Sequence, residues 1–215
     1  MEHNQGFIHS YLTLRKAVGW IGILLPFTLL AGYLLLFKGG IVLDSISQYY
    51  YSGMRDVFVG EICAIALFMF FYKGYDDWDK WTSNLVALFA LGVAFFPTPE
   101  KGTHNWVGTV HFVCATGFFV ILAGISLFLF TKKGSYTTTN KLVRNKIFII
   151  CGIVILVSLI AIFIYLQFFF NEDVRSTIVF WMETVALIAF GVSWLTKGGT
   201  FYPDTSKENY YHMPY

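Results

Sequence analysis

The stretch KIFIICGIVILVSLIAIFIYLQFFF, residues 146–170, has no charged side chain after its first lysine. About 20 apolar residues in a helix are enough to cross the hydrocarbon core of a bilayer. A barrel strand would instead show alternating polarity over about ten residues, and this stretch shows none. Because every backbone N–H and C=O in hydrocarbon needs an internal partner, the stretch predicts a membrane-spanning helix.

Five further apolar segments predict five further spans. They cover residues 17–37, 54–72, 83–96, 105–130 and 177–196. The segment 83–96 is the shortest, at about 15 residues against the roughly 20 that a bilayer requires, and Pro97 and Pro99 follow it. We therefore expect an all-α membrane protein, a six-transmembrane-helix bundle of residues 1–197 followed by a polar C-terminal tail of residues 198–215.

The composition agrees with a membrane protein. Hydrophobic residues make up 56% of the chain and charged residues 13%, whereas a soluble domain has about 25% charged residues. The net charge of +2 gives no basic field for nucleic acid, so membrane lipids are the expected partners. Small residues of the segment 105–130 would permit close helix packing, which leaves a homo-oligomer open; they are Ala115, Gly117, Ala123 and Gly124.

The basic residues predict the orientation in the cell membrane. With the N-terminus inside, eleven of the 15 Lys and Arg residues fall in cytoplasmic segments, and Lys38, Arg55, Lys101 and Arg175 fall outside. This bias predicts that both termini are cytoplasmic. We expect the basic loop 131–145 to lie on the inner surface, where it would contact anionic headgroups.

Aromatic residues are expected at the two membrane interfaces. The inner boundary would hold Trp20, Trp78, Trp81 and Trp194, and the outer one Trp106 and Trp181. The three tyrosines at 49–51 are interpreted as part of the outer aromatic belt.

Three ionisable residues lie inside the apolar segments, each about 10 Å below the outer surface at 1.5 Å per residue. They are Glu61, His111 and Glu183. Each costs about 2.5–3.5 kcal/mol in a bilayer, so each needs a reason. We predict one interior cluster that binds a proton or a cation and opens outward through Asp56, His104 and the loop 45–52, which includes Ser47. The alternative is three separate hydrogen bonds to local hydroxyls.

Two catalytic alternatives use the same residues. His111, Glu61 and Glu183 could together ligate a metal ion, although we expect neither a metal nor a cofactor. Ser45, Ser47 or Ser52 could pair with His111 or His104, with Asp56 as the orienting acid, but no G-x-S-x-G turn is present. The sequence thus favours an outer-face polar cavity that binds lipid, a small solute, an ion or a partner. The alternative is a membrane-embedded hydrolase or transferase acting on lipid at the outer face, and whether the chain is an enzyme stays open.

The region around Pro97 carries a family resemblance. Residues 92–99 read GVAFFPTP, His104 follows, residues 108–112 read GTVHF, and Ala115, Phe118 and Phe119 come next. This resembles the pattern F-P-T…G-x-x-H-x-x-x-A-x-x-F-F of bacterial six-helix membrane proteins of unknown function, which are similar to the DRAM/Frag/Sfk-type family. The serines at 45 and 47 fit the outer serine loop of those proteins. The resemblance implies six helices and brings no established chemistry.

Overall fold

The computed structural model describes residues 2–72, 74, 76–99, 103, 105–132, 138–171 and 173–203, with side chains from Leu12 onward. This part of the chain contains helices and no strand, which confirms the all-α class. The α-helices are α1 (Glu2–Leu35), α2 (Arg55–Phe71), α3 (Asp77–Phe95), α4 (Trp106–Gly124), α5 (Thr139–Phe168) and α6 (Ile178–Lys197). A 3-10 helix η1 (Ser47–Tyr51) lies between α1 and α2, and a π-helical turn η2 (Ile125–Leu129) continues α4.

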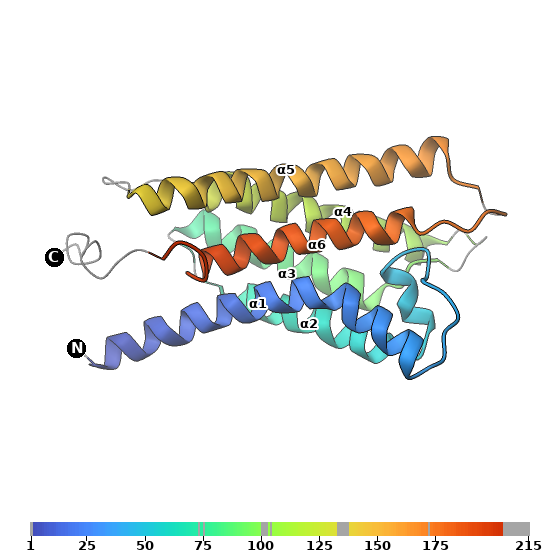
Figure 1. The fold of residues 1–215 in the computed structure, drawn as a ribbon, viewed down its shortest axis with the longest axis horizontal. Helices are drawn as coiled ribbons and strands as arrows, with labels where there is room; N and C mark the ends of the chain where they lie inside the picture. The colour runs from blue at the N-terminus through green and yellow to red at the C-terminus, as the bar shows by residue number, and fades with distance from the viewer. Residues whose placement is uncertain are drawn as a thin grey trace.

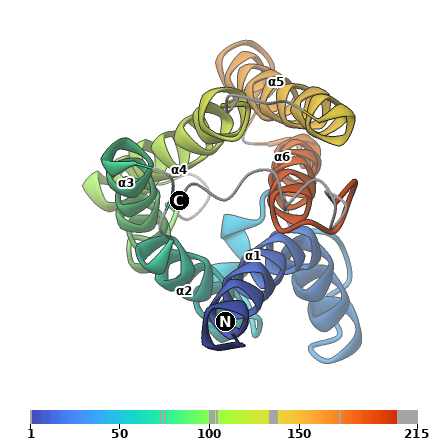
Figure 2. The same ribbon diagram turned by 90° about the vertical axis from the view of Figure 1, so that its left-hand side faces the viewer.

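The six helices run side by side along the long axis of the molecule (Figure 1). Seen from one end they form a ring in sequence order, and α6 closes the ring against α1 (Figure 2). The start of α1 and the end of α6 lie at the same end (Figure 1). We call the other end, where α1 connects to α2, the η1 end.

Four helical stretches are long and apolar enough to cross a membrane: Leu12–Leu35, Trp106–Leu129, Thr139–Phe168 and Ile178–Lys197. They are compatible with an integral membrane protein. The helices α2 and α3 have 17 and 19 residues.

Besides α1, which starts at Glu2, two helices begin earlier than their apolar segments predicted. The helix α3 starts at Asp77, where the Asp76 carboxylate accepts a hydrogen bond of 3.0 Å from the Asp79 amide. The helix α3 therefore extends beyond the short apolar segment 83–96 through a polar first turn. The helix α5 starts at Thr139, capped by Thr138, so nearly the last half of the predicted loop 131–145 is helical. In both cases a polar side chain satisfies an amide of the first turn, which hydropathy does not register.

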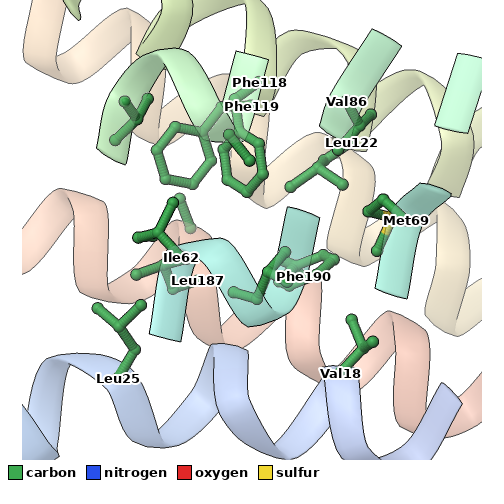
Figure 3. Packing of buried hydrophobic residues seen from close by; sticks show 14 of the residues in the cluster. Val18, Leu25, Ile62, Met69, Val86, Phe118, Phe119, Leu122, Leu187 and Phe190 are labelled. Carbon is green, nitrogen blue, oxygen red and sulfur yellow. The ribbon is translucent and has the colours of Figure 1, made fainter. Parts of the chain in front are cut away.

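The core lies inside the ring and takes apolar side chains from several helices. Figure 3 shows Leu25 of α1, Ile62 of α2, and Leu187 and Phe190 of α6 on the side that faces the phenylalanines of α4, with Met69 of α2 further along the bundle. Relative to a chain exposed to water, the burial of these side chains is the main favourable contribution to the free energy of packing the ring.

Two aromatic residues that we expected at an interface lie in the core instead. Trp194 is 1% exposed, and its ring packs edge-on against Tyr72 and Phe130. Tyr49 is fully buried and packs edge-on against Tyr33. The belt prediction was therefore wrong for these two. The five other tryptophans are exposed, as an interfacial position requires; they are Trp20, Trp78, Trp81, Trp106 and Trp181.

Candidate functional site

A cavity of about 580 Å³ lies at the η1 end between α4, α5 and α6. The segment that holds η1 folds inward beneath the ring of helices and forms one wall (Figure 2). The volume falls within the roughly 300–1,000 Å³ that is usual for small-molecule sites.

The lining of this cavity changes character with depth. Toward the middle of the helices it is apolar, with Phe119 of α4 and Leu159, Ile162 and Phe163 of α5. At the η1 end polar side chains join the lining, beside apolar ones such as Phe112, Phe170 and Val174. The polar residues there are Asp44, Ser45, Ser47, Gln48, Thr103, His111, Gln167, Ser176 and Glu183. The cavity is therefore amphiphilic, with most of its polar groups toward one end.

His111 joins three parts of the chain. Its ring is buried, with Nδ1 2.7 Å from the Phe96 carbonyl oxygen and Nε2 2.9 Å from Ser47 Oγ. Because a carbonyl only accepts, Nδ1 carries a proton. In the neutral form of the ring, Nε2 is then the acceptor for the Ser47 hydroxyl.

Glu183 holds the residue next to Ser47. Its Oε2 accepts a hydrogen bond of 2.7 Å from the amide of Ile46. Glu183 also lines a second, smaller void of about 30 Å³ that extends toward Phe58 and Leu187 in the core. Since a water molecule needs roughly 10–15 Å³ of such space, this void can hold one or two waters beside the carboxylate.

Glu61 lies apart from this group. The Thr28 hydroxyl of α1 is 3.0 Å from Oε1 and 3.2 Å from Oε2 of Glu61, and Glu61 does not line the cavity. Glu61 therefore forms a separate hydrogen bond to a local hydroxyl, which was the alternative to a single interior cluster. Within the described residues, no three His, Cys, Asp or Glu side chains are gathered closely enough to hold a metal ion.

The two remaining candidate residues do not join the cavity lining in the described part of the chain. Asp56 is exposed in the first turn of α2 and does not line the cavity. His104 lies outside the described residues. The position beside His111 Nδ1 that we considered for Asp56 is occupied by the Phe96 carbonyl.

Several residues of the site were not foreseen from the sequence. The Tyr51 hydroxyl donates to the Thr98 carbonyl at 2.7 Å and so ties η1 to the segment after α3. Arg175 lies 3.6 Å from the Asp44 carboxylate and donates to the Val42 carbonyl. The tyrosine run 49–51 and the F-P-T motif are both visible in the sequence, but no sequence signal indicates a contact between them.

The opposite end carries a charged cluster. Lys132 Nζ lies 2.8 Å from the Asp76 carboxylate and 2.7 Å from that of Asp79, which is almost fully buried. Hydrogen bonding to Lys132 lowers the pKa of Asp76, and the two carboxylates raise the pKa of Lys132. Lys141 donates to the Phe130 carbonyl beside this cluster.

These features define a class: an all-helical chain, compatible with an integral membrane protein, with an amphiphilic cavity at one end of a helical ring. Comparison with known protein families, curated proteins and solved structures found no match.

Proposed function

We propose that the chain is an integral protein of the cell membrane whose six helices all cross the bilayer, and that its cavity binds a lipid. The η1 end faces outward and both termini face the cytoplasm. The polar end of the cavity receives the lipid headgroup, and the wall formed by α4 and α5 receives an acyl chain.

The helical ring supports six spans. The helices α2 and α3 run alongside each other between α1 and α4 in the ring (Figures 1 and 2). At 1.5 Å per residue they are about 26 and 28 Å long, close to the roughly 30 Å of a hydrocarbon core. Arg15, Lys16, Lys132, Lys141 and Arg144 lie toward the opposite end, which the excess of basic residues would place in the cytoplasm.

The amphiphilic lining is the observation that carries lipid binding. A site for a hydrated ion would be polar throughout, whereas this cavity is apolar over the part lined by Phe119, Leu159 and Phe163. Phe163 is also 62% exposed. Since hydrocarbon surrounds the ring in the proposed arrangement, an acyl chain that passes between α4 and α5 reaches the cavity without leaving the apolar phase.

A substitution that fills the cavity tests the proposal. Ala115 of α4 lines the cavity, and Val113, two residues away, is 61% exposed and does not. The protein and its Ala115→Trp and Val113→Trp variants would be purified in detergent and examined by native mass spectrometry with added long-chain lipid. We expect the wild type and Val113→Trp to retain one lipid, and Ala115→Trp to retain at least tenfold less.

Equal lipid retention by both tryptophan variants would contradict the proposal. So would a wild-type protein that carries no lipid in excess of a non-specific distribution. A near-ultraviolet circular dichroism spectrum of each variant controls for misfolding, because a lost fold would remove lipid binding for an unrelated reason.

A further inference from the structure

The contact between Ser47 and His111 pairs a hydroxyl with a base, an arrangement that lipid binding alone does not require. In the neutral form of the His111 ring, the Ser47 hydroxyl donates to the unprotonated nitrogen Nε2. Ser47 also lines both the large cavity and the inner void. We propose that Ser47 is a nucleophile and His111 its general base in an acyl-transfer reaction on a long-chain ester lipid. The proposal rests on the proposed lipid-binding function of the same cavity.

The tautomer of His111 is the one this reaction needs. A serine hydroxyl is a weak nucleophile unless an adjacent base removes its proton as it attacks. The Phe96 carbonyl fixes the proton on Nδ1 and leaves Nε2 free to act as that base, 2.9 Å from Ser47 Oγ. This distance is within the roughly 2.6–3.2 Å expected for a nucleophile and its base.

Both members of the pair are held by contacts outside it. Glu183 fixes the Ile46 amide, one residue before Ser47. The Tyr51 hydroxyl binds the Thr98 carbonyl, which joins the far end of η1 to the segment that carries Phe96. Glu183 and Tyr51 are therefore positioning residues, since each orients the Ser47 and His111 pair through the backbone.

The reaction balances without any other reagent than water. Ser47 Oγ attacks the ester carbonyl carbon while its proton passes to His111 Nε2. The carbon–oxygen bond to the lipid alcohol then breaks, and Nε2 returns the proton to the departing alcohol oxygen, which leaves an acyl group on Ser47. Water, losing a proton to Nε2, attacks the acyl carbon, and the Ser47 oxygen leaves with that proton, so the products are a fatty acid and an alcohol.

The substrate class follows from the lining. The acyl chain would lie along Phe119, Leu159 and Phe163, and the ester would reach Ser47 at the polar end. The backbone carbonyl at Nδ1 orients the ring but carries no negative charge to stabilise an imidazolium. We therefore expect a slower reaction than a pair backed by a carboxylate would give.

The test is covalent labelling with a long-chain alkyl fluorophosphonate, in which Ser47 Oγ would displace fluoride from phosphorus. The full-length protein in detergent would be labelled and the modified residue mapped by peptide mass spectrometry. We expect modification at Ser47, none in Ser47→Ala, and a rate at least 100-fold lower in His111→Asn, since a general base contributes roughly 10²–10⁴-fold. Asparagine can still donate to the Phe96 carbonyl, so this variant removes the base and keeps an anchor.

Ser52→Ala is the matched control. Ser52 stands just after η1, bonds the Tyr49 carbonyl and does not line the cavity, so its loss should leave labelling of Ser47 unchanged. The wild-type rate should also rise with pH through a single ionisation and then level off. A purely structural hydrogen bond would produce no such profile.

An unlabelled Ser47 in a folded wild-type protein would overturn the inference. If that protein still retains lipid, the proposed lipid binding survives and only the chemistry is lost. If Ser47 is labelled but no lipid is retained, the proposed function fails instead. Should His111→Asn or Ser47→Ala unfold, the site mapped in the wild type and its pH profile still decide the question.

Discussion

Replacing Gly191 of α6 by alanine should show how closely the ring of helices closes. A Cβ at Gly191 would lie 2.5 Å from the Gly19 carbonyl oxygen of α1 and would also clash with the Ile23 side chain. A Cβ at Gly19 would lie 2.8 Å from the Gly191 carbonyl oxygen. The backbones of α1 and α6 therefore touch at this crossing, as small residues permit in membrane helices.

The size of the effect follows from two opposing terms. Alanine in place of a helical glycine stabilises by about 1 kcal/mol. Forcing a methyl group into a filled space costs about 1–3 kcal/mol. Because the obstructing atom at Gly191 belongs to the backbone, it cannot turn away as a side chain would, and the two helices must separate.

Gly60 of α2 is the matched control. It also lies within a helix, but a Cβ there would meet no heavy atom within 4 Å. Gly60→Ala should therefore show the helix-propensity gain alone. The difference between the two variants isolates the crowding at the crossing, which we expect to destabilise Gly191→Ala relative to Gly60→Ala by about 1–3 kcal/mol.

The measurement is equilibrium unfolding of both variants by sodium dodecyl sulfate in mixed micelles, followed by far-ultraviolet circular dichroism. Gly191→Ala should unfold at a lower detergent fraction than Gly60→Ala. If both variants were stabilised equally, α1 and α6 would not be in backbone contact, and the closed ring would be refuted.

Two further predictions concern the opposite end and the orientation. Lys132 lowers the pKa of Asp76, so their contact stabilises the fold above pH 3.8, the ordinary pKa of the carboxyl group, and is lost as the pH falls below that value. The pKa of Lys132 is raised, so the contact persists up to pH 10.5, the ordinary pKa of the amine, and is lost as the pH rises further. Melting temperatures measured from pH 6 down to about 2.5 should therefore fall less steeply for Lys132→Met than for the wild type, and parallel profiles would contradict the contact. For the orientation, Asn171→Cys at the η1 end should react with a membrane-impermeant maleimide in intact cells and Lys80→Cys at the opposite end should not; the reverse pattern would invert the protein in the membrane.

The helices were predictable because their cause is local. Continuous apolar runs need internally bonded backbone in hydrocarbon, and each of the six predicted segments coincides with a helix. Their starting points were not predictable from hydropathy. The first turns of α3 and α5 are polar and are held by Asp76 and Thr138, whose side chains bond amides three residues on.

The site was predictable only in part, since its contacts depend on the rotation of each helix. The cost of an ionisable group in an apolar segment pointed correctly to His111 and Glu183 as residues that need partners. The same reasoning placed Glu61 with them, but the face of α2 that carries Glu61 meets Thr28 of α1. The Phe96 carbonyl was beyond sequence reasoning, because a backbone acceptor has no residue type to reveal it.

The hydrogen bonds of the η1 segment bear on how a lipid would enter the cavity. Ile46 is bonded to Glu183 of α6, Ser47 to His111 of α4, and Tyr51 to the Thr98 carbonyl after α3. Opening the cavity along the axis of the ring would break these bonds and leave buried polar groups unpaired, at about 1–3 kcal/mol for each group.

Entry from the side of the ring breaks none of these bonds. Phe112 of α4, Phe163 and Leu166 of α5, and Phe170 just after α5 line the cavity and are each exposed. These four side chains are apolar and make no hydrogen bond that a passing acyl chain would have to replace. For the proposed lipid, the route of least cost therefore runs between α4 and α5, with the headgroup reaching Ser47 and His111 last.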